Sequence, residues 1–277
     1  MAKFVPDIKT NRWVIIVPAR VLRAHDNTPF AKQDGIVAEQ KKCPFCPGLE
    51  NLNQELFRIG SQSQWDVRVI ANKYPITDYH EVIIHSPDHN KDIDQLPSSQ
   101  VELIFKTYRD RYNYHTSENH GTVMIFNNHD IHAGASIPHP HSQIVIVPRQ
   151  INLDTIAREP VSNEILRTNY FVAYCPDFSQ WPYEAWVAPL KNSEKTTFGQ
   201  ITDEEITDLA ILLQKLLGFI MNKFKDEDTP YNYYIYHGAD WYLRIIPRLV
   251  HRAGFELGTG LSVNIIDPSE AAREYKG

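Results

Sequence analysis

The chain has 277 residues, with 28 lysines and arginines against 34 aspartates and glutamates and 42% hydrophobic residues. This is the composition of an ordinary globular protein, and the length allows one large domain or two fused units whose core needs no disulfides. A net charge of -6 without a long basic block argues against nucleic acid as a partner, and no run reaches the roughly 18 apolar residues of a membrane span. Three cysteines, an odd number, fit a reducing compartment, so we expect a cytoplasmic protein.

Short apolar runs bounded by turn residues predict strands in the first half of the chain. They cover residues 13–17, 67–70, 82–84, 123–126 and 144–147. Between the third and the fourth run, the segment from Ser99 to Glu102 has the form of a capping box, and apolar residues from Val101 to Tyr112 follow at helical spacing. We therefore expect one amphipathic helix here.

The second half repeats this order of elements. It has a strand-like run at 185–188, a capping box from Thr202 to Glu205 that opens an amphipathic helix, and strand-like runs at 231–236 and 243–246. In both halves the last matched strand ends in Pro-Arg. We interpret this as an internal duplication, although chance similarity between common patterns is the alternative. The predicted class is α+β, mainly antiparallel, with an N-terminal half at 1–150 and a C-terminal half at 151–277.

The densest chemistry is the run His139-Pro140-His141-Ser142-Gln143, which leads directly into an apolar strand. If the extended backbone begins at His139, then His139, His141 and Gln143 share one face because side chains alternate along a strand. Pro140 cannot donate a ladder hydrogen bond, so the run should lie at an edge or at the entrance of the strand. Packing alone does not explain such a run, and we interpret it as a functional site.

A second motif, Cys43-Pro44-Phe45-Cys46, offers two thiolates at the spacing that closes on one zinc ion. Zinc prefers four ligands, and because the chain has no second cysteine pair, His89 and His139 are the candidates for the other two. A buried apolar turn and a redox pair are the alternatives. A closed site with four protein ligands would make the metal structural.

His141 is then the candidate nucleophile. A neutral imidazole can attack a phosphoryl group and form a covalent intermediate, which divides one difficult transfer into two displacements. The charge on the phosphoryl oxygens needs fixed donors, and candidates are present nearby in the sequence. They are Gln143, Ser136, Asn128 and Arg20 or Arg23. Because the amide of Gln143 cannot act as a general acid or base toward water, the site favours transfer over hydrolysis.

Taken together, these motifs resemble the galactose-1-phosphate uridylyltransferase family of the histidine-triad superfamily. The similarity also includes residues 7–15, 65–75, Phe126-Asn127-Asn128 and Gly134-Ala135-Ser136. The segment from Gly254 to Gly260 is similar to the branch that contains plant ADP-glucose phosphorylase. The resemblance implies duplicated histidine-triad-like half-domains and a ping-pong exchange in carbohydrate metabolism, in which His141 carries a nucleoside monophosphate from a nucleotide sugar to a sugar 1-phosphate.

The same resemblance implies a role for each matched residue. Cys43, Cys46, His89 and His139 would be ligands of one structural zinc ion. Gln143 and Ser136 would contact the phosphates, Asn128 would support the reacting phosphoryl group, Asn72 would touch the nucleotide, and Arg20 and Arg23 would be basic phosphate contacts. The family also implies a homodimer in which each sugar pocket is completed by the partner chain, so Phe255 and Glu256 are expected to act across an interface.

One departure from the family concerns the second half. Many relatives carry a His-x-His pair there, which in some of them helps to bind an iron-type metal, whereas this chain has the segment from Asp240 to Arg244. We therefore expect no second metal and a catalytically degenerate second half that contributes substrate binding. Arg244 itself is interpreted as a surface charge, with a sugar-phosphate contact as the alternative.

The leading prediction is a nucleotidyltransferase that exchanges a nucleoside monophosphate between a nucleotide sugar, with UDP-glucose or another UDP-hexose favoured, and a hexose 1-phosphate. One alternative is a phosphorylase in which orthophosphate is the acceptor, which acceptor preference would distinguish. Another is a nucleotide-binding protein without turnover, which would show no isotope exchange between donor and product. The sequence does not identify the base or the sugar.

Overall fold

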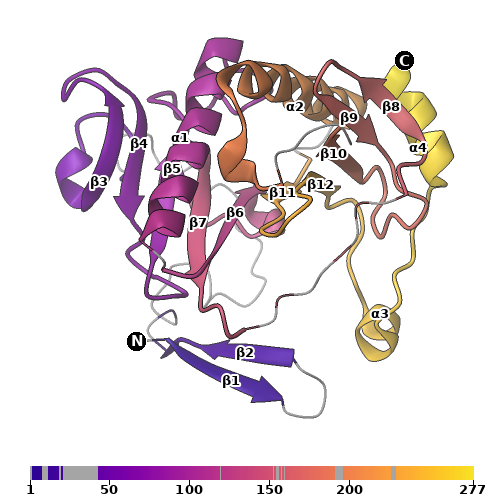
Figure 1. The fold of residues 1–277 in the computed structure, drawn as a ribbon, viewed down its shortest axis with the longest axis horizontal. Coiled ribbons are helices and arrows are strands. Elements are labelled where there is room, and N and C mark those ends of the chain that lie inside the picture. Colours follow the sequence, from indigo (N-terminus) through magenta and orange to yellow (C-terminus); the bar gives the residue numbers. More distant parts are fainter. Residues whose placement is uncertain are drawn as a thin grey trace.

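The computed structural model describes residues 2–7, 12–18, 20, 43–118, 120–151, 153, 156, 158, 160–190, 196–225 and 229–277. Figure 1 shows the helices and strands in chain order. These are β1 (Lys3–Asp7), β2 (Arg12–Ile16), η3 (Glu50–Leu52), β3 (Glu55–Gly60), β4 (Trp65–Ala71), β5 (His80–Ile84), α1 (Ser98–Ser117), β6 (Thr122–His129), η4 (Ile131–Ala133), β7 (His141–Val147), β8 (Glu164–Arg167), β9 (Phe171–Tyr174), β10 (Ala185–Pro189), η5 (Phe198–Gln200), α2 (Asp203–Lys223), β11 (Tyr231–Ile235), β12 (Leu243–Pro247), α3 (Gly254–Thr259) and α4 (Pro268–Lys276).

Ten of these strands form one sheet in the order β3-β4-β5-β7-β6-β11-β12-β10-β9-β8. Every neighbouring pair is antiparallel. Counted inward from its two edges, the sheet has the same arrangement twice, β3-β4-β5-β7-β6 and β8-β9-β10-β12-β11, and the two halves meet where β6 pairs with β11. The predicted α+β class with a duplicated, mainly antiparallel half-sheet is confirmed. The boundary at residue 150 stays a prediction.

Helices α1 and α2 lie along one face of this sheet (Figure 1). Their apolar faces close the main core against the strand residues that point the same way, among them Ile83 of β5, Ile144 of β7 and Tyr233 of β11. The predicted apolar face of α1 is buried, from Val101 to Tyr112. Since strand side chains alternate, the residues between these core positions point to the opposite face, and the candidate site lies there.

The helix starts were predicted with mixed success. The capping box at Thr202 is confirmed, because its hydroxyl accepts from the Glu205 N–H and the Glu205 side chain accepts from the Thr202 N–H. The box at Ser99 was wrong. Helix α1 begins at Ser98, so Ser99 lies inside the helix and Pro97 is the N-cap residue. The side chain of Pro97 has no atom that could accept a hydrogen bond from the helix, so this end has no side-chain cap.

Strands β1, β3, β8 and β9 were not predicted from the sequence. They are short or carry charged residues within the strand, and β1 includes a proline, so the alternation of polar and apolar residues in them is weak. No helix among the described residues combines the length and apolarity that crossing a bilayer requires.

The sheet face opposite the helices differs between the two halves. In the first half it carries an apolar cluster that includes Cys43, Phe45 and Cys46. In the second half it carries aromatic residues that include Trp186 and Tyr242, whose rings stack with centroids 4.2 Å apart. Arg244 lies among these aromatics and is 4% exposed, so the interpretation as a surface charge was wrong: its guanidinium forms an ion pair with the buried Glu184.

Candidate active site and metal centre

The His-Pro-His run enters strand β7 between β5 and β6, in the first half of the sheet. The regular strand starts at His141, and the carbonyl of Pro140 accepts from the His85 N–H, so the proline stands at the entrance of the strand as expected. Residues Ile144 and Ile146 face the helices. His141 and Gln143 alternate with them and therefore share the opposite face, as predicted, whereas His139, the third residue of that prediction, precedes the strand.

The His141 ring is held in one tautomer. Its Nδ1 lies 2.9 Å from the carbonyl oxygen of His139, which can only accept, so Nδ1 carries the proton and donates it. In the neutral ring the lone pair is then on Nε2. The ring is 7% exposed and packs edge-on against Phe45, with centroids 5.2 Å apart. This arrangement presents an unprotonated nitrogen in a fixed orientation, which is the form of imidazole that acts as a nucleophile.

Two asparagines of β6 flank this strand. Asn127 donates from Nδ2 to the carbonyl of His141 over 2.9 Å, which ties the backbone of the candidate nucleophile to β6. The register pairs Asn127 with Ser142, and one residue further it sets Asn128 opposite His141 on the site face. Asn128 accepts at Oδ1 from Asn232 of β11 over 2.9 Å, so the second half helps to orient it.

Gln143 lies beside a group of polar residues that come from the segment before β5. Its Oε1 is 2.9 Å from His80 Nε2, and Asn72 Nδ2 is 3.1 Å from the same nitrogen. Arg20 reaches this segment from the N-terminal part of the chain and donates to the Tyr74 carbonyl over 3.0 Å. The structure thus gathers three of the predicted residues, Gln143, Asn72 and Arg20, around one segment.

The predicted metal ligands come together from three separate segments. The ligand atoms of Cys43, Cys46, His89 and His139 all lie within 4.8 Å of one another, and all four residues are buried. Cys46 Sγ is 3.2 Å from His89 Nδ1 and 3.5 Å from His139 Nδ1, and Cys43 Sγ is 3.8 Å from His139 Nδ1. This cluster could hold a metal ion. It is the single such group of three or more His, Cys, Asp or Glu residues found among the described residues.

Protonation in this cluster matches what a metal requires. His139 donates from Nε2 to the Ser86 carbonyl over 2.8 Å, which leaves its Nδ1 lone pair directed at the sulfurs, and burial lowers the pKa of His139 to about 4. Burial, with a smaller effect of the adjacent Cys43, raises the pKa of Cys46 to about 12. A thiol this hard to ionise releases its proton when a cation offsets the buried charge.

On the helix side of β7, Ser142 is the centre of a buried polar network that the sequence reasoning missed. Its hydroxyl contacts Tyr108 of α1, His85 at 2.7 Å and Tyr233 at 3.1 Å. His85 Nδ1 lies 3.4 Å from the carboxylate of Asp92. The network ties the strand that carries His141 to α1 and to β11 of the second half.

The Asp92 carboxylate is kept ionised by the same network. It receives hydrogen bonds from His129 at 2.7 Å and from the Tyr231 hydroxyl at 3.0 Å. Although burial acts in the opposite direction, the contacts with His129 and His85 lower the pKa of Asp92 well below its usual range. The aromatic residues of β11 indicated a strand, but nothing in the sequence indicated that Tyr231 contacts Asp92, which is 139 residues away.

Other predicted residues lie away from this group or outside the described residues. Arg23 lies outside the described residues. Ser136 is partly buried in the connection between η4 and β7. Phe255 and Glu256 are on α3, which projects from the second half (Figure 1), and Phe255 is 55% exposed. They do not join the His141 group within this chain.

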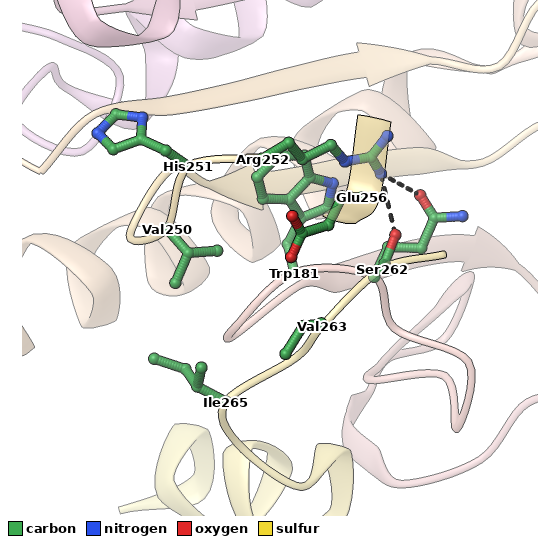
Figure 2. A pocket seen from close by; sticks show the side chains of 9 residues that line it. Trp181, Val250, His251, Arg252, Glu256, Ser262, Val263 and Ile265 are labelled. Carbon is green, nitrogen blue, oxygen red and sulfur yellow. Dashed lines mark hydrogen bonds between the residues drawn. The ribbon is translucent and has the colours of Figure 1, made fainter. Parts of the chain in front are cut away.

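Glu256 instead lines a pocket of the second half, which Figure 2 shows together with Trp181, Arg252 and Ser262. Arg252 donates to Gln180 and to Ser262 over 3.1 Å each, so its guanidinium is already held by neutral acceptors. Its carbon Cζ lies 4.9 Å from the centroid of the Trp181 ring. This pocket is separate in the chain from the residues predicted to react.

Comparison with known proteins gives matches across the whole chain. Residues 26–149 match a domain described as the N-terminal domain of DUF4931, a domain of unknown function. ADP-glucose phosphorylase of Arabidopsis thaliana is 29% identical over 96% of this chain and 90% of its own length. Galactose-1-phosphate uridylyltransferase of Thermotoga maritima is 22% identical over 96% of this chain and 95% of its own length.

Solved structures agree with these matches. The crystal structure of the Arabidopsis thaliana ADP-glucose phosphorylase with bound ADP-glucose is 26% identical and covers 100% of this chain and 99% of its own, with a TM-score of 0.76. A uridylyltransferase structure covers 100% of this chain and 98% of its own at 21% identity and a TM-score of 0.76, which shows the shared fold. The chain is therefore an enzyme homologous to galactose-1-phosphate uridylyltransferase and ADP-glucose phosphorylase, which transfer nucleotidyl groups, and it has their fold.

Proposed function

We propose that this enzyme transfers a nucleoside monophosphate from a nucleotide sugar, with a UDP-hexose as the favoured donor, to a hexose 1-phosphate through a covalent nucleotidyl-His141 intermediate. The observation that carries the proposal is the hydrogen bond from His141 Nδ1 to the His139 carbonyl, since it leaves the lone pair on Nε2. Homology to enzymes named for nucleotidyl exchange supports the class of reaction.

The two steps balance without an added acid or base. In the first, His141 Nε2 attacks the phosphorus of the nucleoside monophosphate group, a P–N bond forms, and the bond to the sugar 1-phosphate oxygen breaks. In the second, a phosphate oxygen of the acceptor attacks the same phosphorus and the P–N bond breaks. The ring becomes positively charged while the adduct exists, and the His139 carbonyl that faces Nδ1–H stabilises that charge.

Side-chain donors around the reacting group would then hold its oxygens. We assign Gln143, Asn128 and Ser136 to the phosphoryl oxygens, Asn72 to the nucleotide and Arg20 to a phosphate, and Arg23, outside the described residues, to the same role as Arg20. Gln143 lies two residues from His141 on one strand face, and Asn128 is opposite His141 in register. Amides stabilise negative charge without delivering a proton to water, so the adduct is directed to an acceptor phosphate.

The metal of the Cys43, Cys46, His89 and His139 cluster is proposed to be zinc with a structural role. Tetrahedral zinc, with bonds of about 2.3 Å to sulfur and about 2.0 Å to nitrogen, separates these two kinds of ligand by about 3.5 Å. Three of the four sulfur to nitrogen distances of the cluster are 3.2, 3.5 and 3.8 Å, which agree with this spacing. Zinc would anchor His139, and so the carbonyl that orients His141, and four protein ligands would leave it no position for substrate.

A phosphorylase is the second candidate, because the relative at 29% identity is named ADP-glucose phosphorylase. It would share the first step, and orthophosphate would then take the nucleotide from His141 and yield a nucleoside diphosphate. The structure with bound ADP-glucose covers the whole chain, which favours testing adenine beside uracil.

The oligomeric state and the role of the second half also belong to the proposal. Phe255, 55% exposed, and Leu257, 75% exposed, give α3 an apolar surface that a second copy of the chain could cover. In a homodimer, Phe255 and Glu256 would complete the sugar pocket of the partner. The half at 151–277 would then contribute binding and shape, and the half at 1–150 the nucleophile and the metal.

The test is to incubate the purified enzyme with UDP-glucose and, separately, with ADP-glucose, and to measure the mass of the intact protein by mass spectrometry. We expect an added nucleoside monophosphate that His141→Ala abolishes. His120→Ala serves as control, since His120 stacks on Tyr79 with ring centroids 4.1 Å apart and has no part in the proposed site. Discharge of the isolated adduct by galactose 1-phosphate or by orthophosphate then separates transferase from phosphorylase, and the absence of any adduct with both donors would overturn the proposal.

A further inference from the structure

The ring of His80 lies between the backbone N–H of Ile76 and the side chain of Gln143. It is the first residue of β5, is 5% exposed, and lies on the strand next to β7, where the register pairs it with Val145. The same register pairs Gln143 with Val82, so His80 and Gln143 are diagonal neighbours on one face of the two strands. Their side chains meet with His80 Nε2 at 2.9 Å from Gln143 Oε1.

The proton on His80 is assigned by its other contacts. The Ile76 backbone N–H donates to Nδ1 over 3.1 Å, so Nδ1 is an acceptor and the proton of the neutral ring is on Nε2. Asn72 Nδ2, at 3.1 Å, cannot accept that proton, because the Oδ1 of Asn72 is taken by the Tyr74 N–H at 2.8 Å and its Nδ2 is a donor. The acceptor of the Nε2–H is therefore the Oε1 of Gln143.

This hydrogen bond fixes which end of the Gln143 carboxamide is turned toward the substrate. The oxygen is held by His80, so the NH₂ group is left to meet oxygen acceptors elsewhere. A carboxamide without such a partner can flip by half a turn, and the flipped form would place its oxygen lone pairs against an anionic phosphoryl group. Nothing in the sequence links these residues, which are 63 positions apart.

We propose that His80 is a positioning residue, which acts through Gln143 by holding its Oε1 and so presents the Gln143 NH₂ group to the phosphoryl oxygens of the nucleotide. The inference rests on the proposed function, in which Gln143 contacts those oxygens. The backbone N–H of Ile76 determines which nitrogen of His80 carries the proton, and His80 determines the orientation of the Gln143 amide. A main-chain donor therefore determines which end of that amide is turned toward the substrate.

Two substitutions of matched chemistry test this. In His80→Gln the side-chain amide nitrogen reaches the position of Nε2 and can donate to Gln143, whereas in His80→Asn it reaches only the position of Nδ1. Two quantities are measured for each variant: the single-turnover rate of nucleotidyl-His141 formation from UDP-glucose and ADP-glucose, and the dissociation constants of UDP and ADP by calorimetry. A double-mutant cycle adds His80→Leu, Gln143→Met and the pair together, and urea midpoints and zinc content verify that each variant is folded.

We expect His80→Leu and His80→Asn to slow adduct formation by about tenfold to a hundredfold, the range usual for an outer partner of a site residue, and His80→Gln to stay within about threefold of the parent. In the Gln143→Met background, His80→Leu should have no further effect on rate or binding. Effects that multiply in the double variant, equal losses in His80→Gln and His80→Asn, or a normal rate in His80→Leu would each overturn the inference. If the parent forms no adduct, the proposed chemistry fails, while the cycle in UDP and ADP binding still decides whether His80 acts through Gln143.

Discussion

Replacing Glu184 by glutamine is the sharpest test of how the second half is stabilised. The Glu184 side chain is fully buried and accepts five hydrogen bonds. Two come from Arg244, at 2.7 and 2.9 Å, and one comes from the Trp186 indole at 2.6 Å. Two more come from the backbone N–H groups of Gln180 and Trp181. Glutamine keeps the shape of the Glu184 side chain, but it removes the negative charge and places an NH₂ group against groups that can only donate hydrogen bonds.

The expected loss is large because Arg244 stays charged and buried. The Arg244 side chain is 5% exposed, and although burial, the largest influence, lowers its pKa, the coulombic attraction of Glu184 and the hydrogen bonds that Arg244 donates to it raise the pKa overall. Removing one partner of a buried ion pair typically costs about 3 to 5 kcal/mol, and we expect Glu184→Gln to reduce the free energy of unfolding by an amount in this range. A change that size is a large part of the total for a protein, commonly about 5 to 15 kcal/mol.

Urea unfolding followed by tryptophan fluorescence measures the effect, at constant pH and with metal present. The matched control is Glu164→Gln, because Glu164 pairs with Arg167 on the surface and both side chains are at least 40% exposed, so the urea midpoint should hardly move. Removing both charges but keeping an acceptor, in Glu184→Gln with Arg244→Met, should recover part of the loss, because the amide oxygen can still accept from the Trp186 indole or the backbone N–H groups. A loss below about 1 kcal/mol in Glu184→Gln, or a double variant as unstable as the single one, would refute the reasoning.

Three further predictions follow from single groups. Stripping the metal with a chelator, or Cys46→Ser, should lower the urea midpoint, and zinc but not magnesium should restore the stripped protein; an unchanged midpoint would contradict a structural metal. In the metal-free protein, burial lowers the pKa of His139 to about 4. The unfolded chain therefore binds a proton that the folded one does not, and this should lower stability by about 3 kcal/mol between pH 6.5 and 4. His139→Gln should remove that share of the pH dependence and leave the share of buried carboxylates such as Asp92. Gly121→Ala should destabilise the protein by about 2 kcal/mol or more, because Gly121 has φ +145 and the new Cβ would meet the Val147 carbonyl oxygen at 2.4 Å. Gly218→Ala, where the new Cβ would meet nothing within 4 Å, should stabilise α2 by about 0.5 to 1 kcal/mol. Equal urea midpoints for the two variants would contradict both expectations.

Local patterns were enough to predict the strand that carries the candidate nucleophile and part of the candidate metal cluster. The alternation of polar and apolar residues through His141, Gln143 and Ile144 predicted a strand with the two polar residues on one face, and the strand is there. The CxxC spacing predicted a metal cluster, and four candidate ligands from distant segments do converge. The strand and the Cys43–Cys46 pair could be predicted because strand periodicity and CxxC spacing depend only on neighbours along the chain.

Contacts between strands could not be predicted in this way. Arg244 was interpreted as a surface charge because a lone arginine in a strand is usually exposed, and its partner Glu184 is 60 residues away. The short strands β8 and β9 escaped prediction for a related reason, since only their place at the edge of the large sheet makes them strands.

What the residues determined by themselves is the identity of the chemistry: an imidazole, an amide, two thiols and two more histidines at spacings that suit phosphoryl transfer and a metal. What only the tertiary structure decided is their state. The proton sits on Nδ1 of His141 because the His139 carbonyl meets it, and on Nε2 of His80 because the Ile76 N–H meets its other nitrogen. Tautomers and amide orientations are determined by the donors and acceptors that the fold brings within about 3 Å, and these contacts cannot be predicted from spacing along the chain.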